Sequence, residues 1–189
     1  AIMPDFCVSQ ITDRILNITS IGTARLKATL YPAQLMRNSV MLTNNAKIIL
    51  ITGASSGIGE ATAKVLAKAG HKVMLAARRI DRLELLAKTI THDGGTAKAY
   101  ALDVVSRDNF TAVVAAITED FGPVDVLVNN AGLMPLSPMG ALKTNEWDQM
   151  IDVNIKGVLN GIESVLTSME HRGGHIINIA SIAAHSVFP

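Results

Sequence analysis

Residues 47–60 read KIILITGASSGIGE, and this stretch decides the fold. Its first half, Ile48–Thr52, is apolar and rich in β-branched residues, which predicts a buried strand. The second half contains three glycines that let the backbone turn sharply and approach a ligand closely: Gly53, Gly57 and Gly59. A strand that runs through a glycine-rich turn into a helix is typical of a dinucleotide-binding unit, in which the helix N-terminus binds a diphosphate.

The spacing of these glycines is G-x-x-x-G-x-G, because Ser55 and Ile58 stand where other dinucleotide-binding turns carry glycine. A glycine pattern alone is weak evidence, and a purely structural turn is the alternative. Here the pattern follows a predicted strand and opens a predicted helix, which is the context that ligand binding requires. We therefore expect the cofactor's phosphates to be bound by Gly53, Ser55, Ser56, Gly57, Ile58 and Gly59.

From Lys47 onward, short apolar runs alternate with helix-length amphipathic stretches, the pattern of repeated βαβ units. The predicted strands are Ile48–Thr52, Lys72–Ala77, Ala97–Asp103, Val124–Asn129 and His175–Ala180. The predicted helices are Gly57–Ala69, Ile80–His92, Ser106–Phe121 and a longer stretch, Thr144–His171, that we expect to be broken. Right-handed connections then give an α/β fold with a doubly wound, Rossmann-like parallel sheet, whose ligand crevice lies at the carboxyl ends of the strands.

The end of the second predicted strand indicates which dinucleotide binds. An acidic residue about 20 positions after the glycine turn would accept hydrogen bonds from the adenosine ribose and select NAD. This chain has Arg78 and Arg79 at the end of that strand instead. A guanidinium can pair with a 2′-phosphate through charge-assisted hydrogen bonds worth about 1.5–3 kcal/mol. NADP is therefore the predicted cofactor and NAD the less favoured one, with two solvated arginines as the alternative interpretation.

Composition excludes several classes of function. The 189 residues carry 17 Lys and Arg against 16 Asp and Glu, a net charge of +1 with no long basic run, so nucleic-acid binding is not expected. No apolar run approaches the ~18 residues of a membrane-spanning helix. A single cysteine, Cys7, and five scattered histidines indicate neither a disulfide framework nor a metal site. A reducing, cytoplasmic location is the expectation.

Residues 1–45 differ from the rest of the chain, with scattered Ser, Thr, Asn and Arg and no sustained periodicity. We interpret them as an irregular leader of unknown role, followed by a dinucleotide-binding, Rossmann-like domain at 46–189. Basic residues outnumber acidic ones in the leader, which is faintly typical of a transit peptide. An expression leader, a natural start near Met41 and the remnant of another module are equally open interpretations.

From Lys47 to the end, the chain resembles the short-chain dehydrogenase/reductase family, of the type that prefers NADP. The resemblance rests on five segments: Thr52–Gly59, Leu102–Val104, Asn129–Gly132, Asp152–Gly157 and Ile177–Ser181. It implies that Asp103 and Val104 flank the adenine and that Asn129 braces the sheet. It also implies that the cofactor crevice is lined by Asn130, Ala131 and Gly132. The end of the fourth strand is where an open α/β sheet binds its ligand, which agrees with that assignment.

Two further residues receive catalytic roles from the resemblance. Ser181 would hydrogen-bond the carbonyl or hydroxyl of the substrate. Asn154 would distort its helix locally and hold a water of the proton relay. On the residues alone, a serine after a strand is usually a turn or cap residue, and Asn154 is an ordinary helix asparagine of poor propensity.

The resemblance stops short of the family's Tyr-x-x-x-Lys motif, in which the tyrosine transfers the proton and the lysine lowers its pKa and holds the ribose. Neither Tyr31 nor Tyr100 has a lysine four residues later, and too few residues follow Ser181 to contain the motif. Losing a positioned acid or base costs about 10²–10⁴ in rate. We therefore expect a sheet that is incomplete at the C-terminus and a chain that is nearly inactive alone, a fragment or one part of a larger assembly.

The leading hypothesis is an oxidoreductase that interconverts an alcohol and a carbonyl of a small molecule by hydride transfer with NADP(H). The alternative is a non-catalytic NADP(H)-binding module or partner subunit, because the same glycine turn supports both. The loop after Gly132 is expected to border the substrate pocket. The family commonly pairs through the helix of Asn154, so the full-length protein is expected to be a homo-oligomer, with neither nucleic acid nor membrane as a partner.

Replacing Arg78 with aspartate should weaken binding of NADP far more than binding of NAD. A carboxylate at this position would repel the 2′-phosphate, and the lost charge-assisted hydrogen bond corresponds to about tenfold or more in affinity. Titration of the wild type and of Arg78→Asp with each cofactor measures the difference. Equal weakening of both cofactors would contradict the assignment.

Overall fold

The computed structural model describes residues 46–181. The expected leader at 1–45, with Cys7 and Tyr31, lies outside the described residues, as do residues 182–189. In the described part, strands and helices alternate from β1 to α4, and a longer helical stretch separates the last two strands. This order is the one that the repeated βαβ pattern predicts.

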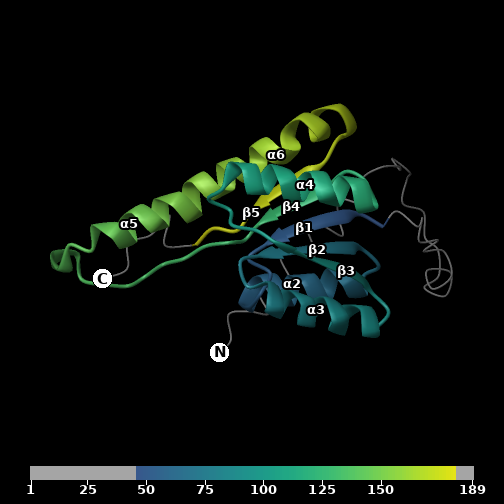
Figure 1. The fold of residues 1–189 in the computed structure, drawn as a ribbon, viewed down its shortest axis with the longest axis horizontal. Helices are drawn as coiled ribbons and strands as arrows, with labels where there is room; N and C mark the ends of the chain where they lie inside the picture. Colours follow the sequence, from purple (N-terminus) through teal and green to yellow (C-terminus); the bar gives the residue numbers. More distant parts are fainter. Residues whose placement is uncertain (1–45, 182–189) are drawn as a thin grey trace, which may run out of the picture.

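Five parallel strands form one sheet in the order β3-β2-β1-β4-β5 (Figure 1). They are β1 Ile48–Thr52, β2 Lys72–Ala77, β3 Thr96–Ala101, β4 Val126–Asn129 and β5 His175–Asn178. β1 is central and buried along its whole length, and it pairs with β2 on one side and β4 on the other. Burial on both faces explains why this strand is a continuous apolar run. The predicted doubly wound, Rossmann-like α/β fold is confirmed.

Helices cover both faces of the sheet (Figure 1). The covering helices are α2 Gly57–Lys68, α3 Ile80–His92, α4 Arg107–Phe121 and α6 Gly157–Arg172, whereas α5 Thr144–Ile151 extends beyond the sheet. α2 and α3 pack on one face, where Leu66 joins Ile51 in an apolar core. α4 and α6 pack on the other, where Phe110 joins Leu50 in a second core. Successive residues of β1 therefore point into two different cores, as the alternation of side chains along a strand requires.

At the carboxyl ends of β1 and β4, the connections that follow the two strands lead toward opposite edges of the sheet. From β1 the chain continues through α2 to β2, whereas β4 pairs with the other edge of β1. Crossovers that leave neighbouring strands in opposite directions open a crevice above the strand ends. Thr52 at the end of β1 and Asn129 at the end of β4 therefore mark the place where a ligand site is expected.

Some strands begin or end at other residues than predicted, for example where a side chain forms a hydrogen bond with the backbone. β3 ends at Ala101 rather than Asp103, because the N–H of Asp103 donates to the side-chain Oδ1 of Asn109 (2.8 Å). β3 also begins one residue earlier than predicted, at Thr96. Four further residues of the predicted strands lie beyond the observed bounds: Val124 and Asp125 before β4, and Ile179 and Ala180 after β5. The ends of α2, α3 and α4 agree with the prediction within one residue.

The long helical stretch does not break as expected; instead, one wider turn interrupts its α-helical pattern. α5 ends at Ile151, and the next five residues, η3 (Asp152–Lys156), form a wider π-helical turn before α6 begins. Asn154 lies in the middle of η3. Such turns are rare and occur frequently at functional sites. The local distortion that the family resemblance implies at Asn154 is therefore present.

His71 is a buried titratable group at the amino ends of β1 and β2, the end of the sheet away from the crevice. The residue is 6% exposed, and its Nδ1 accepts a hydrogen bond from the backbone N–H of Lys47 (3.3 Å). Its Nε2 has no partner among the described residues. Burial, and then the charge of Lys47, lowers the pKa of His71 below its ordinary value. Protonation of His71 in acid therefore favours the unfolded chain.

Replacing His71 with asparagine should make stability less sensitive to mild acid. Because the native pKa lies below the unfolded value of about 6.5, the stability linked to His71 is full above that pH and declines as the pH falls toward the native pKa. Asparagine can accept from the N–H of Lys47 without titrating. Urea unfolding between pH 7 and about 5 measures the decline, with the exposed His92→Asn as the matched control. An equal decline in the wild type and in His71→Asn would contradict the assignment.

Candidate functional site

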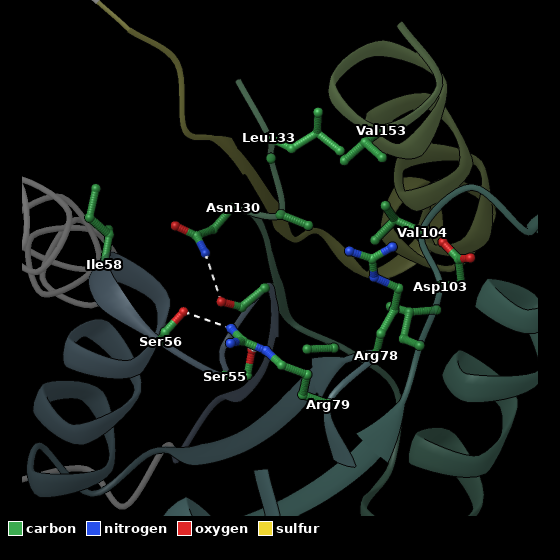
Figure 2. Close-up of a pocket in the computed structure, with 15 residues that line it drawn as sticks. Ser55, Ser56, Ile58, Arg78, Arg79, Asp103, Val104, Asn130, Leu133 and Val153 are labelled. Carbon is green, nitrogen blue, oxygen red and sulfur yellow. Dashed lines mark hydrogen bonds between the residues drawn. The ribbon is translucent and has the colours of Figure 1, made fainter. Parts of the chain in front are cut away.

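A pocket of about 360 Å³ opens at the carboxyl ends of the strands (Figure 2). Its walls come from the glycine turn after β1, the end of β2, the turn after β3, the loop after β4 and one residue of η3. The lining residues are Gly53, Ser55, Ser56, Ile58, Ala77, Arg78, Arg79, Leu102, Asp103, Val104, Asn130, Ala131, Gly132, Leu133 and Val153. Four neighbouring strands thus contribute the segments that follow them.

The pocket gathers the residues that the sequence predicts to bind a cofactor, except Gly57 and Gly59, which lie in the same turn but do not line it. The two expected catalytic residues, Asn154 and Ser181, are not among the described residues that line the pocket. The lining also contains Leu133, from the loop that the sequence predicts to border the substrate pocket, and three apolar residues that sequence reasoning missed: Ala77, Leu102 and Val153. Their signal in the sequence is their position directly beside a predicted site residue.

Thr52 ties the glycine turn to the loop after β4. Its buried hydroxyl accepts hydrogen bonds from the backbone N–H groups of Asn130 and Ala131 (both 3.0 Å) and donates to the carbonyl of Val128 (3.3 Å). In return, the side-chain amide of Asn130 donates to the carbonyls of Thr52 (2.9 Å) and Gly53 (3.3 Å). Sequence reasoning gave Thr52 no role of its own. A threonine that ends an otherwise apolar strand was the available signal.

Glycine is required at two positions where the loop after β4 approaches the glycine turn after β1. Gly53 has a φ of +67°, and a Cβ there would lie 2.8 Å from the Cα of Ala131. A Cβ on Gly59 would lie 2.6 Å from both the Nδ2 of Asn130 and the carbonyl oxygen of Gly53. Both distances are far below normal carbon contacts. The glycine spacing of the sequence therefore serves the packing of the turn as well as its bend.

Arg79 reaches from the end of β2 to the glycine turn (Figure 2). Its Nη2 donates to the hydroxyls of Ser55 (2.8 Å) and Ser56 (2.9 Å), and its Nε lies 3.2 Å from the Ser55 hydroxyl. Among the described residues, no carboxylate forms an ion pair with this guanidinium. The site therefore holds a positive charge on neutral partners beside the N-terminus of α2.

Arg78 lies along the opposite wall, where Figure 2 shows its guanidinium near the side chains of Asp103 and Val104. The backbone turns at this point, where the N–H of Ile80 donates to the carbonyl of Arg78 (3.1 Å), and the two neighbouring arginines diverge. The Oδ1 of Asp103 accepts a hydrogen bond from the N–H of Val105 (3.2 Å), which shapes the turn after β3. The pocket thus has a cationic group on each of two walls.

Asn154 supports the pocket from η3. Its Oδ1 accepts a hydrogen bond from the N–H of Leu133 (2.9 Å), and its Nδ2 donates to the carbonyl of the same residue (2.8 Å). Leu133 lines the pocket, and so does Val153, the neighbour of Asn154. The π-helical turn is therefore bound to the loop after β4 by two hydrogen bonds to one residue.

Ser181 is exposed and lies just beyond β5 at the carboxyl edge of the sheet. β5 is held beside β4 by backbone pairing and by two further bonds. The N–H of Ile179 donates to the carbonyl of Asn129 (2.9 Å), and the side chain of Asn129 donates to that of Asn178 (3.0 Å). Asn129 thus braces the sheet, as the resemblance implied.

Tyr100 is the tyrosine that falls within residues 46–181, and it lies on the edge strand β3. Its hydroxyl donates to Asp120 (3.0 Å), a carboxylate that also pairs with Lys98. Burial, followed by the hydrogen bond to Asp120 and the charge of that group, raises the pKa of Tyr100 far above its ordinary value. Tyr100 does not line the pocket. It is therefore no candidate for proton transfer there.

The sequence profile of the short chain dehydrogenases matches residues 47–189. The chain belongs to this family. Curated relatives include an uncharacterized oxidoreductase of Staphylococcus saprophyticus, 52% identical over 144 residues, and one of Listeria innocua, 50% identical over 149 residues. These alignments cover 76% and 78% of this chain but 58% and 60% of the relatives. This short chain dehydrogenase thus spans about 60% of the length of those relatives.

Solved structures show the same fold. An alcohol dehydrogenase from the archaeon Thermococcus sibiricus, complexed with 5-hydroxy-NADP, matches with a TM-score of 0.73 and 36% identity, covering 76% of this chain and 62% of that one. An actinorhodin polyketide ketoreductase with NADPH also has a TM-score of 0.73, with 37% identity, and the match covers 77% of this chain and 57% of that one. Two proteins of this fold therefore have structures that contain NADPH or a derivative of NADP.

Two other features were sought in the same described range, 46–181. No group of three or more His, Cys, Asp or Glu side chains in it is arranged to hold a metal ion. No helix in it combines the length and the apolar character that crossing a bilayer requires.

Replacing Gly59 with alanine should destabilise this short chain dehydrogenase, because the added Cβ would lie 2.6 Å from Asn130 and from Gly53. Overpacking of this kind typically costs about 1–3 kcal/mol in free energy of unfolding, measured by chemical denaturation. Gly140→Ala is the matched control, because nothing lies within 4 Å of its Cβ position, and its effect should stay within about 0.5 kcal/mol. A Gly59→Ala variant as stable as the wild type would contradict the packing described above.

Proposed function

We propose that this short chain dehydrogenase interconverts an alcohol and a carbonyl of a small molecule, with NADP(H) as its partner in hydride transfer. The observation that carries the proposal is the pocket in which a glycine turn faces two arginines at the carboxyl ends of the strands. Bound NADP(H) would supply or accept the hydride, while a proton joins or leaves the substrate oxygen. The described residues would bind and orient the two molecules.

The glycine turn suits the diphosphate of the cofactor. α2 begins at Gly57, whose φ is +61° and whose Cβ position has no atom within 4 Å, so a ligand can approach the backbone there. Ser56 is the N-cap residue of α2, yet its side chain makes no capping hydrogen bond and accepts from Arg79 instead. Because the Ser56 side chain does not cap α2, it leaves the first N–H groups of the helix available to bind an anion. The helix dipole also favours an anion there.

Arg79 and the serine hydroxyls suit the 2′-phosphate that distinguishes NADP from NAD. The guanidinium is held within 2.9 Å of both hydroxyls, and among the described residues it has no carboxylate partner. A phosphate at this place would gain charge-assisted hydrogen bonds from the guanidinium and neutral ones from the hydroxyls. The NADP derivative and the NADPH in the two similar structures support the same choice.

The adenine would lie on the wall formed by Arg78, Asp103 and Val104. Val104 is an apolar neighbour for the base, and the guanidinium of Arg78 at this wall would add to the positive charge that attracts the 2′-phosphate. The nicotinamide would then lie toward the wall that begins at Asn130 and includes Leu133. This orientation places the reacting end of the cofactor on the side of the loop that the sequence associates with the substrate.

The catalytic roles remain those that the family resemblance implies. We assign to Ser181 a hydrogen bond with the substrate oxygen, and to Asn154 the support of the wall at Leu133 and of a water in the proton relay. The proton transfer itself is assigned to no described residue. In the family it belongs to the tyrosine of Tyr-x-x-x-Lys.

A second candidate function is the binding of NADP(H) without chemistry, as a module or partner subunit. The observation that favours it is the position of Tyr100, whose hydroxyl is bonded to Asp120 at the edge of the sheet rather than placed at the pocket. A positioned acid or base contributes about 10²–10⁴ in rate. The two candidates therefore predict the same cofactor site and different turnover.

Replacing Arg79 with alanine should weaken NADPH binding about tenfold or more and change NADH binding little, because the lost partner faces the 2′-phosphate. Fluorescence titration of the full chain with each cofactor measures both affinities. Arg107→Ala is the matched control. It removes an exposed arginine that is paired with Glu163 (2.9 Å) and lies outside the pocket lining.

Absence of NADPH binding by the wild type would contradict the proposed function. Equal loss of both cofactors in Arg79→Ala would contradict the assignment of the 2′-phosphate. A panel of aldehydes and ketones, followed by the absorbance of NADPH, separates the two candidates. Oxidation of NADPH supports the oxidoreductase, and binding without oxidation supports the non-catalytic module.

A further inference from the structure

The turn after β3, which carries Val104 into the pocket, is held by an asparagine from a distant helix. The Nδ2 of Asn160, on α6, donates to the carbonyl oxygens of Val104 (2.9 Å) and Val105 (3.1 Å). Asn160 lies 55 residues beyond Val105 along the chain. These hydrogen bonds therefore connect the turn to the helix layer that covers this face of the sheet.

Asn160 is almost entirely buried, with 6% of its surface exposed. Asparagine is a poor helix former, and a buried amide without partners costs about 1–3 kcal/mol. The apolar core lies further along the same helix, where Val165 is 1% exposed. A polar side chain on the buried face of α6 is therefore explained by the two carbonyls that it binds.

Gly157 brings the helix and the turn into direct contact. A Cβ on Gly157 would lie 2.7 Å from the Cγ2 of Val104 and 3.1 Å from its Cβ. The side chain of Val104 thus packs on the backbone of α6, while Asn160, one turn further along, binds its carbonyl. Both the side chain and the main chain of this pocket residue are positioned by one helix.

At the start of the turn, the N–H of Leu102 donates to the carbonyl of Ala77 at the end of β2 (3.0 Å). The other side-chain contacts of the turn involve near neighbours in the sequence. The N–H of Asp103 donates to Asn109 (2.8 Å), and the N–H of Val105 donates to Asp103 (3.2 Å). Such local bonds give the turn its shape but do not set its place relative to the opposite wall of the pocket. The position of the turn relative to the opposite wall depends on contacts with elements that reach both walls of the pocket.

The helical stretch that contains Asn160 reaches both walls. α6 continues directly from η3, in which Asn154 binds the backbone of Leu133 through two hydrogen bonds. Leu133 and Val104 both line the pocket, on the sides that we assign to the nicotinamide and to the adenine. One continuous helical stretch therefore carries an asparagine for each wall.

We propose that Asn160 is a positioning residue that sets the adenosine side of the pocket by holding Val104 and Val105 to α6. The inference rests on the proposed NADP(H) function and adds to it the residue that orders the adenine wall. Because the link to the opposite wall runs through a helix, the separation of the two walls is set by helix geometry. A preordered wall reduces the entropy that the protein loses when the cofactor binds.

The test uses 2′,5′-ADP, which contains the adenosine half of NADP with its extra phosphate, and the full chain. Asn160→Leu removes both donors at similar side-chain size and should weaken 2′,5′-ADP binding roughly tenfold in calorimetric titration. NADPH binding should fall by the same factor, because the change is confined to the half that both ligands share. Asn160→Ser retains one hydroxyl donor and should give an intermediate loss.

Val165→Ala is the matched control, because it removes buried methyl groups from the same helix and makes no hydrogen bond to the turn. It should lower the thermal unfolding midpoint, as Asn160→Leu does, and bind 2′,5′-ADP like the wild type. This contrast separates positioning of the wall from general loss of stability. If Asn160→Leu does not fold, the milder Asn160→Ser decides.

Unchanged 2′,5′-ADP affinity in the folded Asn160 variants would overturn the inference. An equal loss of affinity in Val165→Ala would also overturn it, because general destabilisation would then explain the effect. NADPH binding by the wild type is measured first. Its absence would overturn the proposed function and this inference together, whereas normal binding with insensitive variants would overturn the inference alone.

Discussion

The hydroxyl of Thr52 is the contact on which the site depends. It accepts hydrogen bonds from two successive N–H groups after β4, while the amide of Asn130 donates to the carbonyls of Thr52 and Gly53. A net hydrogen bond contributes about 0.5–1.5 kcal/mol, but a buried polar group left unpaired costs more, so the strand ends are held together as a unit. Glycine at 53 and 59 leaves room for this approach. Thr52, Asn130 and the two glycines therefore act together to hold the ends of β1 and β4 in contact.

The fold could be predicted wherever an element carries its own periodicity. Ile48–Thr52 is apolar throughout because helices cover both faces of β1, and its predicted bounds are those of the structure. Prediction was less accurate at the end of β3. The apolar pattern continues there, but Asn109 captures the N–H of Asp103 and ends the pairing. That bond depends on where α4 begins in space, and a hydrophobic pattern carries no information about it.

Site residues could be predicted where chemistry demands an unusual residue type, such as glycine in a sharp turn or arginine beside a phosphate. The apolar wall residues Leu133 and Val153 carry no such signal, because apolar side chains are equally common in cores. Asn160 was missed for a different reason: from the sequence alone, an asparagine in a helix suggests a solvent-facing position. Its neighbours hold a clue, because residues 157–161 read GVLNG, in which three poor helix formers mark a face in close contact.

The two neighbouring arginines show how the fold divides the positive charge of the pocket. The chain turns directly after β2, and Arg79 points to Ser55 and Ser56 while Arg78 lies toward Asp103. The guanidinium of Arg79 is already held by neutral hydroxyls, and the proposed phosphate would add charge-assisted hydrogen bonds, which are stronger. In the proposed complex, the entropy of ordering this long side chain is therefore lost on folding rather than on binding, which favours affinity for NADP.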